Sequence, residues 1–143
     1  MASAEPLAAL PLLADLSPPA LQRLAARARR LTLSRSSVVI RQGERDGRTF
    51  LILSGTLVAK AADADGVVDT LSTMAVGELF GEIAALDGQP RTATVIAMTD
   101  AELLCIERAD FLELLRSGAR FRMQVMALMA SRLRRQSAHL ASR

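Results

Sequence analysis

The first thirty residues repeat apolar side chains at helical spacing. Leucines at positions 7, 10, 13 and 16 predict a short helix over residues 5–16. The run Ser17-Pro18-Pro19 is typical of a helix start, because serine caps free N–H groups and proline suits the first turn. A second helix is therefore expected from Ser17 to about Arg30, which completes an N-terminal helical segment over residues 1–30.

From residue 31 the pattern changes to short apolar runs separated by turn residues. β-Branched residues are frequent in these runs, Gly55 ends one of them, and the loop Asp63–Gly66 is typical of a hairpin. Short strands at regular turn spacing indicate a small β-barrel or a jelly roll over residues 31–108. The runs that predict strands cover residues 38–40, 49–54, 56–62, 67–74, 92–98 and 102–106.

Two helices are expected after the strands, over residues 109–143. A short one covers Asp110–Leu115, and a long one covers Ala119–Leu140, which contains neither Gly nor Pro. The long helix has residues at alternating spacings of three and four, as in a coiled coil with one polar layer. Because this seam spans barely two heptads, we expect a monomer with the helix as a lid on its own barrel rather than a homodimer. The seam residues are Met126, Met129, Leu133, Gln136 and Leu140.

The length of 143 residues fits one domain and leaves no room for a second. The chain holds four Phe and no Trp or Tyr, which argues against a stacking platform for single-stranded nucleic acid. Its longest charge-free run, Thr49–Ala59, is too short to cross a bilayer as a helix, so no membrane span is expected.

Few residues offer catalytic or metal-binding chemistry. Cys105 and His139 are the single cysteine and the single histidine, so neither a Cys/His zinc site nor a nucleophile–histidine pair is expected. Cys105 lies in an apolar run, which favours a buried small side chain, and His139 is expected to face solvent. The sequence therefore predicts no enzyme, no metal and no cofactor. A single cysteine also fits a reducing compartment, and we expect a cytoplasmic protein.

Arginine dominates the charge, with a formal net charge of +3. Residues 23–48 hold eight arginines against two acids, and residues 114–143 hold seven arginines and no acid. We interpret both stretches as solvated helix faces rather than as a nucleic-acid or membrane surface.

The stretch of residues 77–95 concentrates features that suit a phosphate and a sugar. Gly81 permits an unusual backbone close to a ligand, and the turn after it offers free N–H groups. Arg91 carries a planar fork that suits phosphate, and Thr92 adds a hydroxyl. Glu82 would repel a phosphate unless it faces another group, and a ribose hydroxyl is a natural partner. From the residues alone, a hairpin turn with a structural salt bridge remains the alternative.

At these residues the sequence also resembles a family. Phe80-Gly81-Glu82-Ile83-Ala84 and Pro90-Arg91-Thr92-Ala93-Thr94-Val95 resemble the phosphate-binding cassette of cyclic nucleotide-binding domains. The resemblance extends over nearly the whole chain, through Ile40–Glu44 and Phe50–Gly55. It implies a mainly β fold with flanking helices: an eight-stranded jelly-roll barrel with N-terminal helices and a long C-terminal helix.

The resemblance also implies roles for seven residues. Glu82 would accept a hydrogen bond from the ribose 2′-hydroxyl, and Arg91 would pair with the cyclic phosphate. Thr92 would form a hydrogen bond with a phosphate oxygen or with a guanine amino group. Backbone N–H groups near Gly81, Ile83 and Ala84 would support the phosphate. Arg132 is the candidate on the C-terminal helix for capping the base, with Arg134, Arg135 and Gln136 nearby.

We therefore expect one domain over residues 1–143 that binds a 3′,5′-cyclic purine nucleotide and signals by movement of its C-terminal helix. cAMP is favoured over cGMP because no second guanine-specific group is evident. The downstream partner is a separate protein or a fused output domain. Transcriptional relatives carry a helix-turn-helix after this helix, whereas this sequence stops at Arg143. We therefore expect no nucleic-acid binding from this chain alone. Two alternatives are the effector domain of a transcription regulator and a ligand-free scaffold of the same fold.

Overall fold

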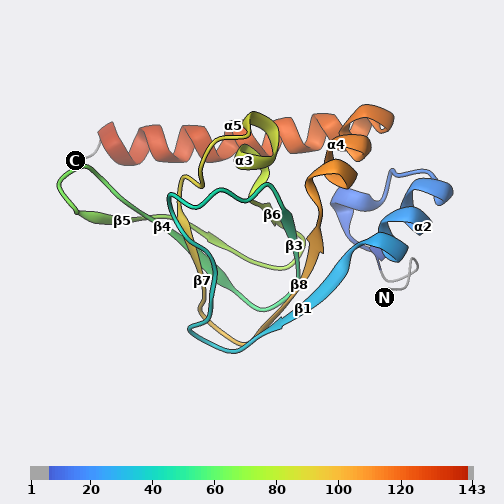
Figure 1. Cartoon of the computed structure of the whole chain (residues 1–143). Helices are drawn as coiled ribbons and strands as arrows, with labels where there is room; N and C mark the ends of the chain where they lie inside the picture. Colours follow the sequence, from blue (N-terminus) through green and yellow to red (C-terminus); the bar gives the residue numbers. More distant parts are fainter. Residues whose placement is uncertain (1–6, 142–143) are drawn as a thin grey trace.

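A computed structural model describes residues 7–141, with side chains through residue 138. Within this range eight strands form two four-stranded antiparallel sheets, in the orders β1-β8-β3-β6 and β2-β7-β4-β5. The sheets face each other, and the long helix α5 runs along one side of them (Figure 1). This is the mainly β, eight-stranded fold with flanking helices that the sequence predicts. The strands are β1 (Arg29–Leu33), β2 (Val38–Ile40), β3 (Thr49–Ser54), β4 (Leu57–Ala62), β5 (Val68–Met74), β6 (Leu79–Phe80), β7 (Thr94–Ala97) and β8 (Ala101–Ile106).

The central strands β3 and β8 are buried on both faces, which explains their continuous apolar runs. In β3, Phe50 and Ile52 point between the two sheets, whereas Leu51 packs under the helices. In β8, Leu103 and Cys105 point between the sheets in the same way. The fold thus has two apolar cores, one between the sheets and one between a sheet and the helices.

The N-terminal segment departs from the prediction at both helices. Within the described part of the predicted helix 5–16, Leu7 and Ala8 are helical, and a separate 3-10 turn, η1 (Pro11–Leu13), follows instead of one continuous helix. The helix α2 (Pro18–Arg27) begins as predicted, with the Ser17 side chain accepting from the N–H of Ala20 at 3.3 Å.

The helix α2 ends three residues earlier than predicted. Ala28 is already extended, and Arg29 opens strand β1, which the sequence analysis missed. The arginines of this edge strand favour a helix by propensity, but pairing with β8 outweighs that preference. Arg30 donates to Glu102 across the strands at 2.6 Å, which supports this pairing.

Three helices follow from the second half of the chain: α3 (Glu82–Asp87), α4 (Arg108–Ser117) and α5 (Ala119–Ala141). Helix α4 is longer than predicted at both ends. Gly118 separates α4 from α5, and Phe111 meets Phe121 edge to face with ring centroids 6.0 Å apart.

Helix α5 lies on its own barrel, but the predicted seam does not form one face. Phe121 and Val125 are buried beneath the helix, and Met129 packs at the edge of the same core. Met126 and Leu133, by contrast, are exposed. The predicted seam is therefore divided, since Met129 lies on the side of the core whereas Met126 and Leu133 lie on the exposed side. The side chains of Leu140 and His139 lie outside the described residues.

Candidate nucleotide-binding site

The cassette of residues 77–95 lies between strands β6 and β7, with α3 in its middle. Gly81 joins β6 to α3 in the left-handed region, with φ of +85°. A Cβ there would lie 2.8 Å from both the carbonyl oxygen of Arg48 and a guanidinium nitrogen of Arg91. The backbone approaches these groups so closely that only glycine fits.

Arg91 is buried beneath this turn, with 3% of its surface exposed. Its Nη1 donates to the carbonyl oxygen of Gly81 at 3.0 Å, and its Nη2 donates to the carbonyl oxygen of Arg48 at 2.7 Å. Nη2 also lies 3.3 Å from Oδ2 of Asp46. Nε of Arg91 is buried without a hydrogen-bond partner in the described part of the chain. The Nε–H of this guanidinium is thus available to a further acceptor.

Asp46 is the carboxylate that balances the buried charge of Arg91. It accepts three hydrogen bonds from the Arg48 guanidinium, at 3.0 and 3.2 Å from Nε and at 2.8 Å from Nη2, and these bonds hold its pKa well below the ordinary range. Burial lowers the pKa of Arg91, whereas the nearby Asp46 carboxylate acts to raise it. The guanidinium remains charged at neutral pH. The sequence analysis did not single out Asp46.

The turn of residues 42–44 fixes the backbone of Arg91. The N–H of Gly43 donates to the carbonyl oxygen of Arg91 at 2.8 Å, and the N–H of Arg91 donates to the carbonyl oxygen of Glu44 at 2.8 Å. Gln42 anchors the same turn through two hydrogen bonds between its amide and the backbone of Ala62. The stretch Ile40–Glu44 therefore positions the arginine of the cassette.

Glu82 is buried and paired with Arg132 of helix α5. Oε1 of Glu82 accepts from Nη1 of Arg132 at 3.0 Å, and the two side chains are 4% and 11% exposed. Nη2 of Arg132 lies 4.0 Å from Oε1 of Glu78. Nε and Nη2 of Arg132 are buried without hydrogen-bond partners among the described residues. The pair ties α5 to the first residue of α3.

All seven predicted site residues line one cavity of about 70 Å³. Gly81, Glu82, Ile83, Ala84, Arg91, Thr92 and Arg132 are the seven. Gln136 lies one turn beyond Arg132 in the same wall, and an apolar wall comes from β4, β5 and β7. The sequence analysis missed that apolar wall, whose members are Ala59, Leu71, Met74 and Val95 together with Ser72. An alternating strand pattern marks buried residues but does not say which of them border a cavity.

The single cysteine lies apart from this cavity. Cys105 is 2% exposed in the core between the sheets, and burial raises the pKa of its thiol. Among the described residues, His, Cys, Asp and Glu form no group of three that could hold a metal ion. In the same range, we find no helix with the length and apolarity that crossing a membrane requires.

Comparison with known proteins places this cavity in context. The family model described as "Cyclic nucleotide-binding domain" matches residues 30–117. Over 93 residues, or 65% of this chain, the sequence is 37% identical to the cyclic AMP receptor protein of Thermus thermophilus, of which it covers 43%. It is 35% identical over 104 residues, or 73% of the chain, to a cyclic nucleotide-gated potassium channel of Mesorhizobium japonicum, of which it covers 27%.

The fold matches a solved structure of the same kind. The crystal structure of the Thermus thermophilus catabolite activator protein superposes with a TM-score of 0.77 at 30% identity, covering 92% of this chain and 62% of that one. The chain thus spans less than half of the two curated relatives named above. The matched range of the family model contains the turn 42–44, the cassette and both sheets. This chain belongs to the cyclic nucleotide-binding domain family.

Proposed function

We propose that the chain is a non-enzymatic sensor for a 3′,5′-cyclic purine nucleotide, with cAMP favoured, and that α5 transmits occupancy. One observation carries the proposal: Arg91, which is buried, and Arg132, whose side chain is 11% exposed, have N–H donors without partners among the described residues, and both border one cavity together with the buried Glu82. Buried donors without partners cost free energy and are rare, so a ligand with acceptor oxygens is a reasonable partner for them.

The phosphate end of the ligand would lie at Arg91. Nε of Arg91 is free to donate to a phosphate oxygen, and the first N–H groups of α3 at Glu82, Ile83 and Ala84 have no acceptor within the helix. The hydroxyl of Thr92 lies in the same wall of the cavity. A phosphate at this point would compete with Asp46 for the guanidinium, which lies only 3.3 Å from that carboxylate.

The ribose and the base would extend toward α5. The Glu82 carboxylate would accept from the ribose 2′-hydroxyl, and Arg132 would share that carboxylate. Because Arg132 is occupied there, Gln136 is the better placed residue for the base. A glutamine amide matches adenine, which offers a donor and an acceptor on one edge, and this favours cAMP.

Occupancy would move α5 because the cavity is too small for the ligand as it stands. A volume of about 70 Å³ is well below the roughly 300 Å³ or more of a typical small-molecule pocket. A purine, a ribose and a phosphate need more room, so Arg132 and its helix would shift as the nucleotide enters. The ligand then shifts the helix by its different affinity for the two positions.

The rest of a longer protein would supply the output. The relatives named above include a cyclic AMP receptor protein and a cyclic nucleotide-gated potassium channel, and joining this chain to either kind of effector would leave the cavity unchanged. The effector domain of a transcription regulator is therefore the second candidate. A ligand-free scaffold is disfavoured, because it would leave the donors of Arg91 and Arg132 buried for no benefit.

Titration calorimetry with cAMP and cGMP tests the proposal. The chain should bind both, cAMP more tightly, and Arg91→Ala should weaken binding by about one to two decades, since a charge-assisted contact is worth roughly 1.5–3 kcal/mol. Arg41→Ala is the matched control, because Arg41 is exposed. Equal binding by wild type and a folded Arg91→Ala variant would overturn the assignment.

A further inference from the structure

The side of α5 that faces away from the barrel carries a regular apolar stripe. Its members lie at spacings of four and three in strict alternation, which is the repeat of a coiled-coil seam. Met123, Met126 and Leu133 are 62%, 56% and 65% exposed. The stripe covers about 27 Å of helix. Its exposed apolar members are Ala119, Met123, Met126, Ala130 and Leu133, and the polar Ser137 occupies the next position of the repeat.

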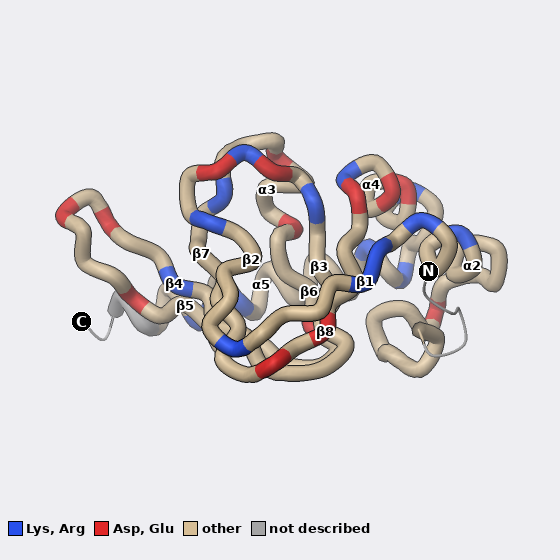
Figure 2. The backbone as a smooth tube through the Cα atoms, turned by 60° about the horizontal axis from the view of Figure 1, so that its bottom comes forward, with Lys and Arg blue, Asp and Glu red and all other residues tan. Residues whose placement is uncertain are grey.

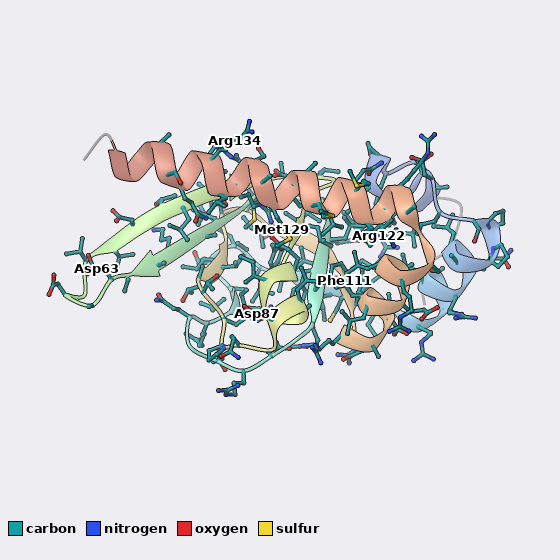
Figure 3. All side chains as sticks on the ribbon, turned by 90° about the horizontal axis from the view of Figure 1, so that it is seen from above. Asp63, Asp87, Phe111, Arg122, Met129 and Arg134 are labelled. Atoms are coloured by element: carbon teal, nitrogen blue, oxygen red, sulfur yellow. The ribbon has the colours of Figure 1, made fainter. Side chains whose placement is uncertain are left out.

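This stripe is not needed to hold α5 on its own barrel. Phe121 and Val125 fix the helix from beneath, and Arg132 binds Glu82 on the same inward side. Figure 3 looks onto the outer side of α5, which crosses the molecule over the barrel. The helix thus presents two faces: one closes the nucleotide cavity, and the other is exposed along its length.

The residues that flank the stripe are basic. With Met123 and Ala130 at the a positions of the heptad, Arg120 and Arg134 occupy e positions and Arg122 occupies a g position. All three are exposed, and no acidic residue occurs between residues 114 and 143. Elsewhere acidic and basic positions are interspersed, as over the barrel and α4 (Figure 2).

Among the described residues, the contacts of these arginines balance their charge only weakly. Arg122 donates to the carbonyl oxygen of Leu115 at 2.6 Å. This bond satisfies one N–H donor, but the acceptor is neutral and does not offset the positive charge of Arg122. Arg120 lies 4.0 Å from Asp15 with both side chains exposed, a contact of little strength. Charges at e and g positions decide coiled-coil partners, so a second copy of α5 would be repelled and an acidic helix would be attracted.

We propose that the outer face of α5 docks an acidic amphipathic helix of another protein. The partner's apolar side chains pack on Met123, Met126 and Leu133, and its Glu or Asp residues pair with the flanking arginines. The proposal does not depend on nucleotide binding, because no residue of the outer face lines the nucleotide cavity.

A pair of synthetic peptides tests the proposal. Each is a labelled helix of about three heptads with Leu at a and d; one carries Glu at every e and g position and the other carries Lys. Fluorescence anisotropy with the full chain should give saturable binding of the Glu peptide and binding about tenfold weaker for the Lys peptide. Equal binding of the two peptides, or none of either, would overturn the proposal.

Two sets of variants separate the docking face from overall charge. Arg120→Glu together with Arg134→Glu should reverse the preference between the peptides. Arg23→Glu together with Arg41→Glu makes the same change of net charge at exposed sites outside α5, and it should leave the preference intact. Met126→Glu should abolish binding, whereas Val76→Glu should not, although both residues are 56% exposed. Equal effects of the matched variants would contradict a specific face.

Two other occupants are outcomes of the same experiment. A homodimer that persists at low salt in light scattering, and that Met126→Glu dissolves, would show that a second copy covers this face. Binding to vesicles of phosphatidylserine that exceeds binding to the Glu peptide, and that Met126→Glu removes, would show a membrane surface instead. Either result would overturn the proposal, while a monomer that ignores such vesicles and binds the Glu peptide supports it.

Discussion

At the scale of single residues, the buried side chains of charged type gather at one cavity. Within the described side chains these are Glu82 and Arg91, and both border that cavity. Burying a charge costs free energy unless it is paired, and here each pair is completed from a distant segment: Asp46 for Arg91 and Arg132 for Glu82. The two pairs are therefore the points at which a ligand would act.

Glu82→Gln should weaken binding of cAMP by about tenfold or more, because a hydrogen bond to a carboxylate is worth roughly 1.5–3 kcal/mol. The same variant should bind 2′-deoxy-cAMP about as well as wild type does, since that ligand lacks the hydroxyl. Calorimetry with the two ligands measures the difference, and the exposed Glu44→Gln serves as control. If both ligands lose affinity equally, Glu82 is a structural residue and does not contact the ribose.

Asp46 should make the fold sensitive to acid. Its pKa is lower in the folded state than the ordinary value of 3.8, first because of the hydrogen bonds from Arg48. Its contribution to stability is therefore complete above that ordinary value and is lost as the pH falls through the folded pKa. Denaturant unfolding at neutral pH and near pH 3 should show Asp46→Asn less stable than wild type at neutral pH, with a smaller gap in acid. A gap that stays constant, or one matched by Asp65→Asn in the hairpin loop, would contradict this role.

At the scale of elements, the sequence was informative where burial is strongest. Strands β3 and β8 carry unbroken apolar runs because both of their faces are covered, and both were predicted nearly to the residue. Strand β1 was missed because it is an edge strand with exposed arginines and lacks an apolar run. Its extended conformation depends on pairing with β8, which lies far along the sequence. Asp46 was missed for a related reason, since its partner Arg91 lies 45 residues further along the chain.

Helix α5 depends on one buried ion pair for its position over the cavity. Arg132→Ala removes the partner of Glu82, and breaking a buried pair in this way costs roughly 3–5 kcal/mol. Backbone amides of α5 should then exchange with solvent at least about tenfold faster in the absence of nucleotide. Hydrogen exchange read by mass spectrometry measures this, with Arg134→Ala as the control because Arg134 is exposed on the same helix. An unchanged exchange rate in Arg132→Ala would show that the apolar contacts of Phe121 and Val125 alone hold the helix.

At the scale of the whole molecule, the two faces of α5 connect a ligand with a partner. The inward face touches the cavity through Arg132 and Gln136, and the outward face is apolar and basic. A shift of the helix on nucleotide binding would move both faces together, because a helix of this length behaves as one rigid rod. The partner would thus sense occupancy without contacting the nucleotide.

The oligomeric state tests this arrangement of faces. Two copies joined along the outer stripe would bring Arg120, Arg122 and Arg134 of each copy together with no acid to offset them, which disfavours a dimer most at low salt. Light scattering at micromolar concentration should therefore give a monomer at low salt, with and without cAMP. High salt screens the repulsion, so any self-association should appear only there and should vanish in Met126→Glu. A dimer that persists in every condition would instead make α5 an association element, and its outer face would not be free for a partner of opposite charge.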